Sequence, residues 1–209
     1  EKDLAINEEV DKLRLKATSS ILSGRRDVIV VATVSCIFGM GNPEDYKAGI
    51  IRIQKGQVIS RNDFLYRLVD SLYSRTEGDM NRGNFRVKGD TVDINLPYVD
   101  FGIRIHFFGD QIEQIDEIEI TSGKRITSMD FAAIFPANLY VAPKDRLKSI
   151  LRHIEDELAQ QKKYFESEMK YSEAKRIEER TQFDLEMMRE LGYCSGIENY
   201  SRFFDGRAK

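Results

Sequence analysis

Residues 84–96 read NFRVKGDTVDINL, two runs of alternating apolar and polar residues around the pair Gly89-Asp90. Two-residue turns that contain glycine and aspartate join antiparallel strands, and side chains along a strand alternate between its two faces. A hairpin that turns at Gly89-Asp90 pairs the apolar residues on one face: Val87 with Val92 and Phe85 with Ile94. This stretch therefore predicts a hairpin with one buried face.

The other face of this hairpin is charged, with Arg86, Lys88 and Asp93. Residues 61–88 hold six basic against four acidic residues, whereas residues 99–130 hold three basic against seven acidic. Separated charge of this kind suits docking onto an acidic protein surface. The alternative is that Arg86 only pairs with Asp93, which lies directly opposite in this register. Residue patterns alone leave both interpretations open.

A second hairpin is expected at Gly109-Asp110. Its first strand turns Ile103, Ile105 and Phe107 inward and Arg104, His106 and Phe108 outward. The second strand, residues 112–120, breaks strict alternation and predicts a bulge. Upstream, apolar residues at Ile50, Ile53, Val58 and Ile59 suggest strands, and Ser60 with Asp63 predicts the start of a helix that carries Phe64, Leu65, Leu68, Val69 and Leu72.

Both flanks of this region have different patterns. Ile6, Val10, Leu13, Ala17 and Ile21 form one stripe of an expected helix that ends near Gly24. Residues 27–33 are expected to form a buried strand of an α/β sheet, and Asn42-Pro43-Glu44 has the pattern of a helix start. From Pro143 on, Leu147, Ile150, Leu151, Ile154 and Leu158 share one helix face, and a second helix is expected over residues 171–191 with Gly192 after its end.

These patterns predict a mixed α+β and α/β chain in three parts. Residues 1–48 are expected to be a partial α/β segment, residues 49–138 an antiparallel, β-rich α+β insert, and residues 139–209 a helical segment.

Composition excludes several classes of function. The net charge is -3, from 32 basic and 35 acidic residues, so a nucleic-acid contact has to be local. Two distant cysteines, Cys36 and Cys194, and two histidines predict no metal site and a reducing compartment. The apolar runs are too short for a membrane helix, and Glu1-Lys2-Asp3 does not begin a signal peptide. A cytoplasmic protein without a membrane partner is expected.

Catalytic and phosphate-binding motifs are scarce. The sequence has no GxxxxGK[ST] loop for a nucleotide. The glycines of residues 38–42 are expected to form a turn, with a phosphate or DNA-backbone contact as the alternative. His106 and His153 are expected at the surface, and the acids of the long helices are expected to be solvated. These residues predict that the chain alone is no enzyme; an enzyme with an unrecognised site is the alternative.

Residues 180–202, RTQFDLEMMRELGYCSGIENYSR, combine polar, aromatic and glycine residues at a density that suits a binding site better than a plain core helix. This block, together with VVATVSCIFG at residues 30–39, GNFRVKGD at 83–90 and FFGD at 107–110, resembles the UvrB family of the excinuclease ABC complex, which acts in bacterial nucleotide excision repair. The resemblance covers nearly the whole chain.

The resemblance implies an internal piece of a damage-verifying subunit. In that family the ATP-binding loop and a tyrosine-rich β-hairpin lie before the equivalent of Glu1, and the acidic Mg²⁺-organising motif lies after the equivalent of Lys209. ATP and Mg²⁺ would therefore be cofactors of the intact, DNA-dependent ATPase of helicase-like fold, and this piece would hold none. UvrA is the implied partner of residues 49–138, while DNA and UvrC would meet the intact subunit.

Site residues follow from the resemblance position by position. Arg75, Arg86 and Lys88 fall where the family presents basic groups to UvrA. The positions of Arg180, Tyr193 and Glu198 match the path of DNA: a phosphate contact, a stacking ring and an organising carboxylate. The alternatives are that Tyr193 packs in the core and Glu198 caps a turn.

The sequence departs from the family in three places: Lys88 stands where arginine is common, His106 where an acid is usual, and Asn95-Leu96-Pro97 where an aromatic residue usually precedes proline. A UvrA-docking part of a transcription-repair coupling factor is the alternative family, although the block at residues 192–202 is not expected there.

Overall fold

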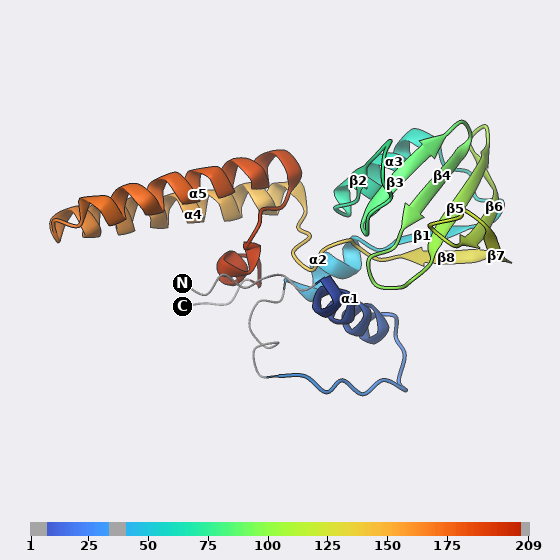
Figure 1. The fold of residues 1–209 in the computed structure, drawn as a ribbon, viewed down its shortest axis with the longest axis horizontal. Coiled ribbons are helices and arrows are strands. Elements are labelled where there is room, and N and C mark those ends of the chain that lie inside the picture. The colour runs from blue at the N-terminus through green and yellow to red at the C-terminus, as the bar shows by residue number, and fades with distance from the viewer. Residues whose placement is uncertain (1–7, 34–40, 206–209) are drawn as a thin grey trace. The chain divides into compact units, whose positions relative to one another are not determined.

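The structure is a computed structural model that describes residues 8–33 and 41–205 (Figure 1). The described residues form two compact units. The first contains residues 8–31 and 46–139, and the second contains residues 32–33, 41–45 and 140–205. The dividing point near residue 45 lies inside α2 (Pro43–Ala48). The three-part division of the sequence stays a prediction.

A six-stranded sheet dominates the first unit. In spatial order its strands are β2 (Ser74–Arg75), β3 (Asn84–Lys88), β4 (Thr91–Asn95), β5 (Gly102–Phe108), β6 (Gln111–Ile118) and β7 (Arg125–Met129). β2 and β3 are parallel, and all the other neighbours are antiparallel. The predicted α+β class is confirmed.

Both predicted hairpins are present. β3 and β4 pair Val87 with Val92 and Phe85 with Ile94, in the expected register. β5 and β6 meet at the Gly109-Asp110 turn, where Phe108 pairs with Gln111. The register shifts between His106 and Phe107, which leaves Glu113 of β6 without a register partner on β5 and confirms the bulge.

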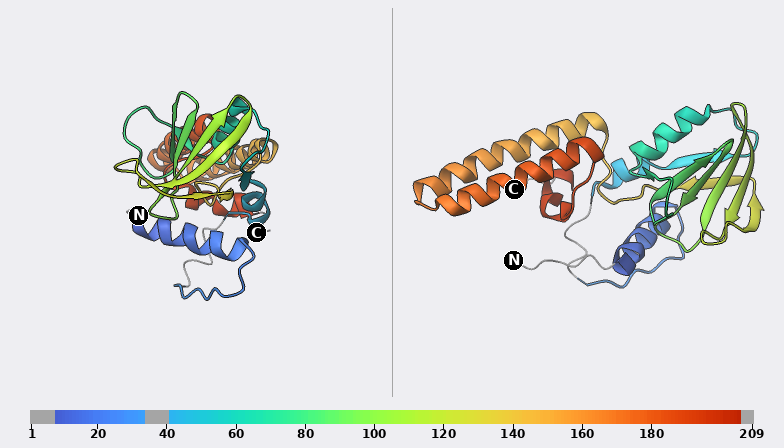
Figure 2. Two further views of the ribbon diagram at one scale, coloured as in Figure 1. Left: turned by 90° about the vertical axis from the view of Figure 1, so that its right-hand side faces the viewer. Right: turned by 45° about the horizontal axis from the view of Figure 1, so that its top comes forward.

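The apolar face of this sheet packs against α3 (Arg61–Asp70). The helix begins at Ser60, whose hydroxyl accepts a hydrogen bond from the Asp63 N–H at 3.1 Å, as the capping pattern predicts. Phe64 and Leu68 are fully buried, and the Phe64 ring lies 5.8 Å from that of Phe107. Figure 2 shows α3 along this face of the sheet.

A two-stranded antiparallel sheet of β1 (Ile51–Gln54) and β8 (Phe131–Ile134) completes the first unit's β structure. Three buried tyrosines lie beside it and satisfy backbone groups near Phe135. Tyr73 donates to the Phe135 carbonyl at 2.8 Å, Tyr98 accepts from the Phe135 N–H at 3.1 Å, and Tyr46 donates to the Pro136 carbonyl at 3.4 Å.

The first expected helix is α1 (Glu8–Leu22). Ile6 lies outside the described residues. Val10, Leu13 and Ile21 of the predicted apolar stripe are 49%, 61% and 52% exposed, whereas Leu15 and Ser19 are buried. The periodicity therefore predicts the helix correctly, but this stripe does not face the core of the described unit.

The strand predicted for residues 27–33 is wrong: these residues form no strand, and Ile29 and Val31 are more than 90% exposed. A β-branched run needs a neighbouring strand to satisfy its backbone groups, and none lies beside it among the described residues. The α/β layer expected for residues 1–48 is therefore absent from the described part. The helix α2 begins as predicted, because Asn42 Oδ1 accepts a hydrogen bond from the Glu44 N–H at 2.8 Å. Residues 38–40 of the predicted glycine turn lie outside the described ranges.

The second unit is built on an antiparallel pair of long helices, α4 (Lys144–Ser167) and α5 (Tyr171–Leu191) (Figure 2). Gly192 ends α5 with a φ of 72°, the left-handed conformation expected of a residue after a helix. Ile150, Leu151 and Ile154 of α4 are buried, as predicted. η2 (Ile197–Tyr200), a 3₁₀ helix, and α6 (Ser201–Asp205) follow.

Candidate functional site

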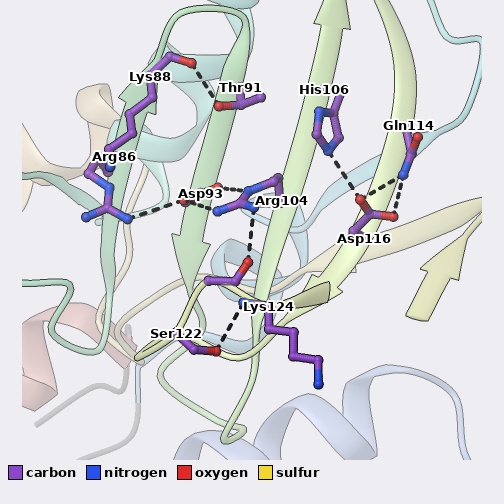
Figure 3. A network of polar contacts seen from close by, with 11 residues as sticks. Arg86, Lys88, Thr91, Asp93, Arg104, His106, Gln114, Asp116, Ser122 and Lys124 are labelled. Atoms are coloured by element: carbon purple, nitrogen blue, oxygen red, sulfur yellow. Dashed lines mark hydrogen bonds and ion pairs between the residues drawn. The ribbon is translucent and has the colours of Figure 1, made fainter. Parts of the chain in front are cut away.

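The polar face of the six-stranded sheet carries a row of residues in direct register across five strands. Figure 3 labels Arg86, Asp93, Arg104 and Asp116 of this row. From β3 to β7 the row is Arg86, Asp93, Arg104, Asp116 and Ser128. Paired residues on neighbouring strands lie on the same face. Because positive and negative side chains alternate along the row, each charge lies beside an opposite one.

Asp93 and Arg104 form the tightest pair of this row. Arg104 Nε donates to Asp93 Oδ1 at 2.6 Å, and Arg104 Nη2 donates to Asp93 Oδ2 at 2.9 Å. Arg104 Nη1 donates to the Gly123 carbonyl at 3.1 Å. Burial alone raises the pKa of Asp93, but the hydrogen bonds and charges of Arg104 and then Arg86 outweigh it, so the pKa lies below its ordinary value.

Arg86 makes fewer and longer hydrogen bonds than Arg104 does. Its Nη2 reaches Asp93 Oδ2 at 3.4 Å, the same oxygen that Arg104 already uses. Its Nε is buried and has no hydrogen-bond partner among the described residues. The predicted pairing of Arg86 with Asp93 therefore exists, but it leaves most of this guanidinium group without an acceptor from the described part of the chain.

Asp116, the second buried carboxylate, is held by uncharged donors and a histidine. Ser128 Oγ donates at 2.6 Å, Gln114 Nε2 contacts both oxygens at 2.8 and 2.9 Å, and His106 Nε2 lies 3.2 Å from Oδ2. Burial raises the pKa of Asp116, but these hydrogen bonds outweigh it and the pKa is lowered. His106 is therefore part of this network.

Lys88 lies on the same face of β3 as Arg86, two residues further along. Its carbonyl accepts from Thr91 Oγ1 at 2.8 Å (Figure 3), and its ammonium group makes no ion pair within the part of the chain that the structure describes. Arg75 is in register with Phe85, whose side chain is buried on the opposite face of the sheet. The structure therefore brings Arg86 and Lys88 together and sets Arg75 apart. The Arg75 side chain is 56% exposed, and its Nη2 lies 3.8 Å from Oε1 of Glu77.

The other three site residues predicted from the resemblance lie in the second unit. Arg180 is exposed on α5, Tyr193 is half-buried after Gly192, and Glu198 is half-buried in η2. Two of these residues, Arg180 and Glu198, shift the pKa of the buried Cys194 thiol. Burial raises the pKa of its thiol to about 12, Asp184 and Glu198 add to this shift, and Arg180 opposes it. Arg180 and Glu198 thus act electrostatically on one buried group.

Sequence reasoning did not identify three polar contacts of these sites. They are the Asp93–Arg104 pair, the donors around Asp116, and the hydrogen bond from Tyr200 to Asp184 at 2.7 Å. The alternation of β4 and β5 already directs Asp93 and Arg104 outward, so aligning the two predicted hairpins side by side predicts the first pair.

Among the described residues, no helix is long and apolar enough to span a membrane. Groups of histidine, cysteine and carboxylate side chains that could hold a metal ion are likewise not found in those ranges.

Comparison with known proteins finds two domain families. Residues 51–140 match the family described as "UvrB interaction domain", and residues 145–206 match the "UvrB third helical domain". The UvrABC system protein B of Cytophaga hutchinsonii is 59% identical over 99% of this chain, and those of Bacteroides fragilis and Leptospira biflexa are 58% and 47% identical over 100% of it. The chain spans 31% of the length of each of these three relatives. The chain therefore belongs to the UvrB family and corresponds to a segment of that protein with its interaction domain and third helical domain.

Proposed function

We propose that the polar sheet face around Arg86 and Lys88 binds UvrA, through acidic side chains on the UvrA surface. The observation that carries this proposal is the incomplete hydrogen bonding of Arg86. A guanidinium group presents five N–H donors in a fork that matches a carboxylate, and only one long contact uses them here. The Nε atom is buried, so a partner carboxylate would bind at the terminal Nη nitrogens, where it would add hydrogen bonds without breaking a strong one.

Rigidity supports the same role. Arg86 and Lys88 lie on β3, whose neighbours on both sides are hydrogen-bonded strands. The polar side chains beside them are held by the buried carboxylates of Asp93 and Asp116. A face that is ordered before binding loses little conformational entropy on association. Lys88 contributes a point charge, and Arg75, from its separate position, is proposed to contact the edge of the same partner.

Arg86→Glu tests this proposal. Reversing the charge places like charges together at the interface, and truncating one member of a buried charge pair costs about 2 to 5 kcal/mol. The dissociation constant for purified UvrA, measured by surface plasmon resonance, is expected to rise at least about 30-fold. Arg52→Glu, a charge reversal at an exposed position of β1, is the matched control and is expected to bind as the unmodified chain does. Equal binding by both variants would exclude Arg86 as a contact.

For the second unit, we propose that Arg180, Tyr193 and Glu198 lie along the path of DNA in the intact subunit. The support is that Arg180 and Glu198 both shift the pKa of Cys194, which directly follows Tyr193 in the chain, so a cation, a carboxylate and an aromatic ring lie near one residue. In the intact subunit, Tyr193→Ala is expected to weaken binding of single-stranded DNA by about 1 to 3 kcal/mol, the usual range for a base stacked on a ring. Tyr171→Ala, at an exposed position of α5, is the control. A Tyr193→Ala variant that binds DNA normally would exclude the stacking role.

We further propose that this chain alone does not hydrolyse ATP, and that ATP, Mg²⁺ and UvrC meet the intact subunit through other parts of it. The support is the lack of a GxxxxGK[ST] loop in these 209 residues. A phosphate-release assay of the chain, with and without DNA, is expected to show no turnover above buffer. Measurable turnover would revive the hypothesis of an unrecognised enzyme.

A further inference from the structure

We propose that Arg104 is a positioning residue: it neutralises Asp93 and so keeps the guanidinium group of Arg86 available to a partner carboxylate. This inference rests on the proposed UvrA contact of Arg86. It assigns Arg104 a role that needs no contact with the partner.

The first argument is that all three nitrogens of the Arg104 guanidinium group already make hydrogen bonds within the chain. Two of them donate to Asp93 and one to the Gly123 carbonyl. A methyl group built at Gly123 would lie 3.4 Å from Arg104 Nη2, so the backbone of this turn closely covers the guanidinium group. The fork of Nε and Nη2 is occupied by Asp93, so to offer this fork to a partner carboxylate Arg104 would have to leave a buried anion unpaired, which is costly.

The second argument is the charge balance at Asp93. One carboxylate lies between two guanidinium groups, and its two oxygens are both occupied by Arg104 at short distances. Arg86 reaches only Oδ2, at 3.4 Å. The negative charge of Asp93 is thus cancelled by Arg104, and the positive charge of Arg86 remains for a partner (Figure 3).

The third argument is what Asp93 would do without Arg104. The Asp93 side chain is 5% exposed, and a carboxylate buried to this degree needs hydrogen-bond donors or a paired cation; apart from Arg104, the side-chain donor that reaches Asp93 in the described structure is Arg86. Arg86 lies directly opposite on β3 and is the remaining guanidinium group within reach of it in the described structure. Arg86 would therefore form the two-pronged pair with Asp93 itself, and its donors would no longer point to a partner.

A pair of variants tests this mechanism. Arg104→Gln removes the cation and leaves Asp93 free to capture Arg86, so the dissociation constant for purified UvrA is expected to rise at least tenfold. Adding Asp93→Asn removes the charge that captures Arg86, and an asparagine–glutamine contact replaces the ion pair. The double variant is expected to bind UvrA within about twofold of the unmodified chain.

The outcomes separate the two proposals. Weak binding by both Arg104→Gln and the double variant would overturn the positioning role, because it indicates that Arg104 itself contacts the partner. Normal binding by Arg104→Gln would also overturn it. If Arg86→Glu leaves binding unchanged, the proposed function fails instead. Circular dichroism and thermal unfolding show whether each variant folds. If Arg104→Gln does not fold, Arg104→Lys takes its place: one ammonium group cannot occupy both oxygens of Asp93, so weaker UvrA binding that Asp93→Asn restores supports the proposal, and unchanged binding overturns it.

Discussion

Tyr200 donates its hydroxyl hydrogen to Oδ2 of Asp184 at 2.7 Å, and this contact joins η2 to the middle of α5. Asp184 is 8% exposed, so its carboxylate depends on protein donors more than on water. Burial, followed by the hydrogen bond to Asp184 and then the Asp184 charge, raises the pKa of Tyr200 above its ordinary value. The hydroxyl therefore stays protonated and remains a donor at neutral pH.

Tyr200→Phe is expected to lower the free energy of unfolding of the second unit by about 1 to 3 kcal/mol, because it leaves a buried carboxylate without a donor. Tyr171→Phe, which removes a hydroxyl from a 65% exposed ring, is the matched control and is expected to change stability by less than about 0.5 kcal/mol. Urea unfolding followed by helical circular dichroism measures both. Equal stability of the two variants would show that water replaces the lost donor.

The pH dependence of stability is expected to include a contribution from Asp116. Its folded pKa lies below the ordinary value of 3.8, so its stabilising contribution is fully present above pH 3.8 and is lost as the pH falls through the folded pKa. Asp116→Asn removes this contribution. The variant is therefore expected to be less stable than the unmodified chain at pH 7, and the difference is expected to shrink at pH values below 3.8.

Urea unfolding at neutral and at acidic pH measures this effect. Asp110→Asn is the control, since this side chain lies in the exposed turn between β5 and β6. If the difference in unfolding free energy between Asp116→Asn and the unmodified chain stays constant with pH, the assignment is contradicted. The variant would then act through packing and not through charge.

Gly102, the first residue of β5, is expected to tolerate no side chain. A methyl group there would lie 2.2 Å from Cδ1 of Ile120 and 2.7 Å from the backbone oxygen of Ile94. The second contact is with a strand that pairs with β5, so relief requires the two strands to move apart. Gly102→Ala is therefore expected to destabilise the first unit by about 1 to 3 kcal/mol.

Thermal unfolding of Gly102→Ala should be compared with that of Gly78→Ala. The nearest atom to a methyl group at Gly78 is Thr76 Oγ1 at 3.9 Å, an ordinary contact, and no loss of stability is expected. If both variants unfold alike, the close approach of Gly102 to Ile94 is not a constraint on this sheet.

Local patterns predicted the hairpins of the first unit because every residue that decides their register lies within the same few positions. The Gly89-Asp90 turn sets the pairing of Val87 with Val92 without help from elsewhere in the chain. The same holds for α3 and its Ser60 cap. The residues that determine these elements are close together in the chain, so their pattern was sufficient to predict them.

Elements whose partners lie far away were predicted less well. An apolar β-branched run is typical of a buried strand, yet Ile29 and Val31 are exposed in the described structure because no strand lies beside them there. At the candidate site, Arg86 and Lys88 were identified through the family resemblance, whereas Arg104 and Asp116 were not. Their importance depends on which strands become neighbours, and this information is not contained in either hairpin alone.

Cys194 is expected to be chemically inert in the folded chain. Burial suppresses its reactivity in two ways: it leaves the residue 1% exposed to a reagent, and it raises the pKa of the thiol to about 12. Because the thiolate is the reactive form, only about one molecule in ten thousand is reactive at pH 8 even where the reagent has access. A Cys36→Ser variant isolates this thiol for measurement with a disulfide reagent.

In that variant, reaction at pH 8 is expected to be at least about 100-fold slower in the folded chain than in urea. The control moves the thiol by one residue: Ser195 is exposed, so Cys36→Ser with Cys194→Ser and Ser195→Cys is expected to react rapidly without denaturant. Rapid labelling of native Cys194 would mean that the segment between Gly192 and η2 opens easily. The electrostatic grouping of Arg180 and Glu198 around this thiol would then not describe the dominant state of the second unit.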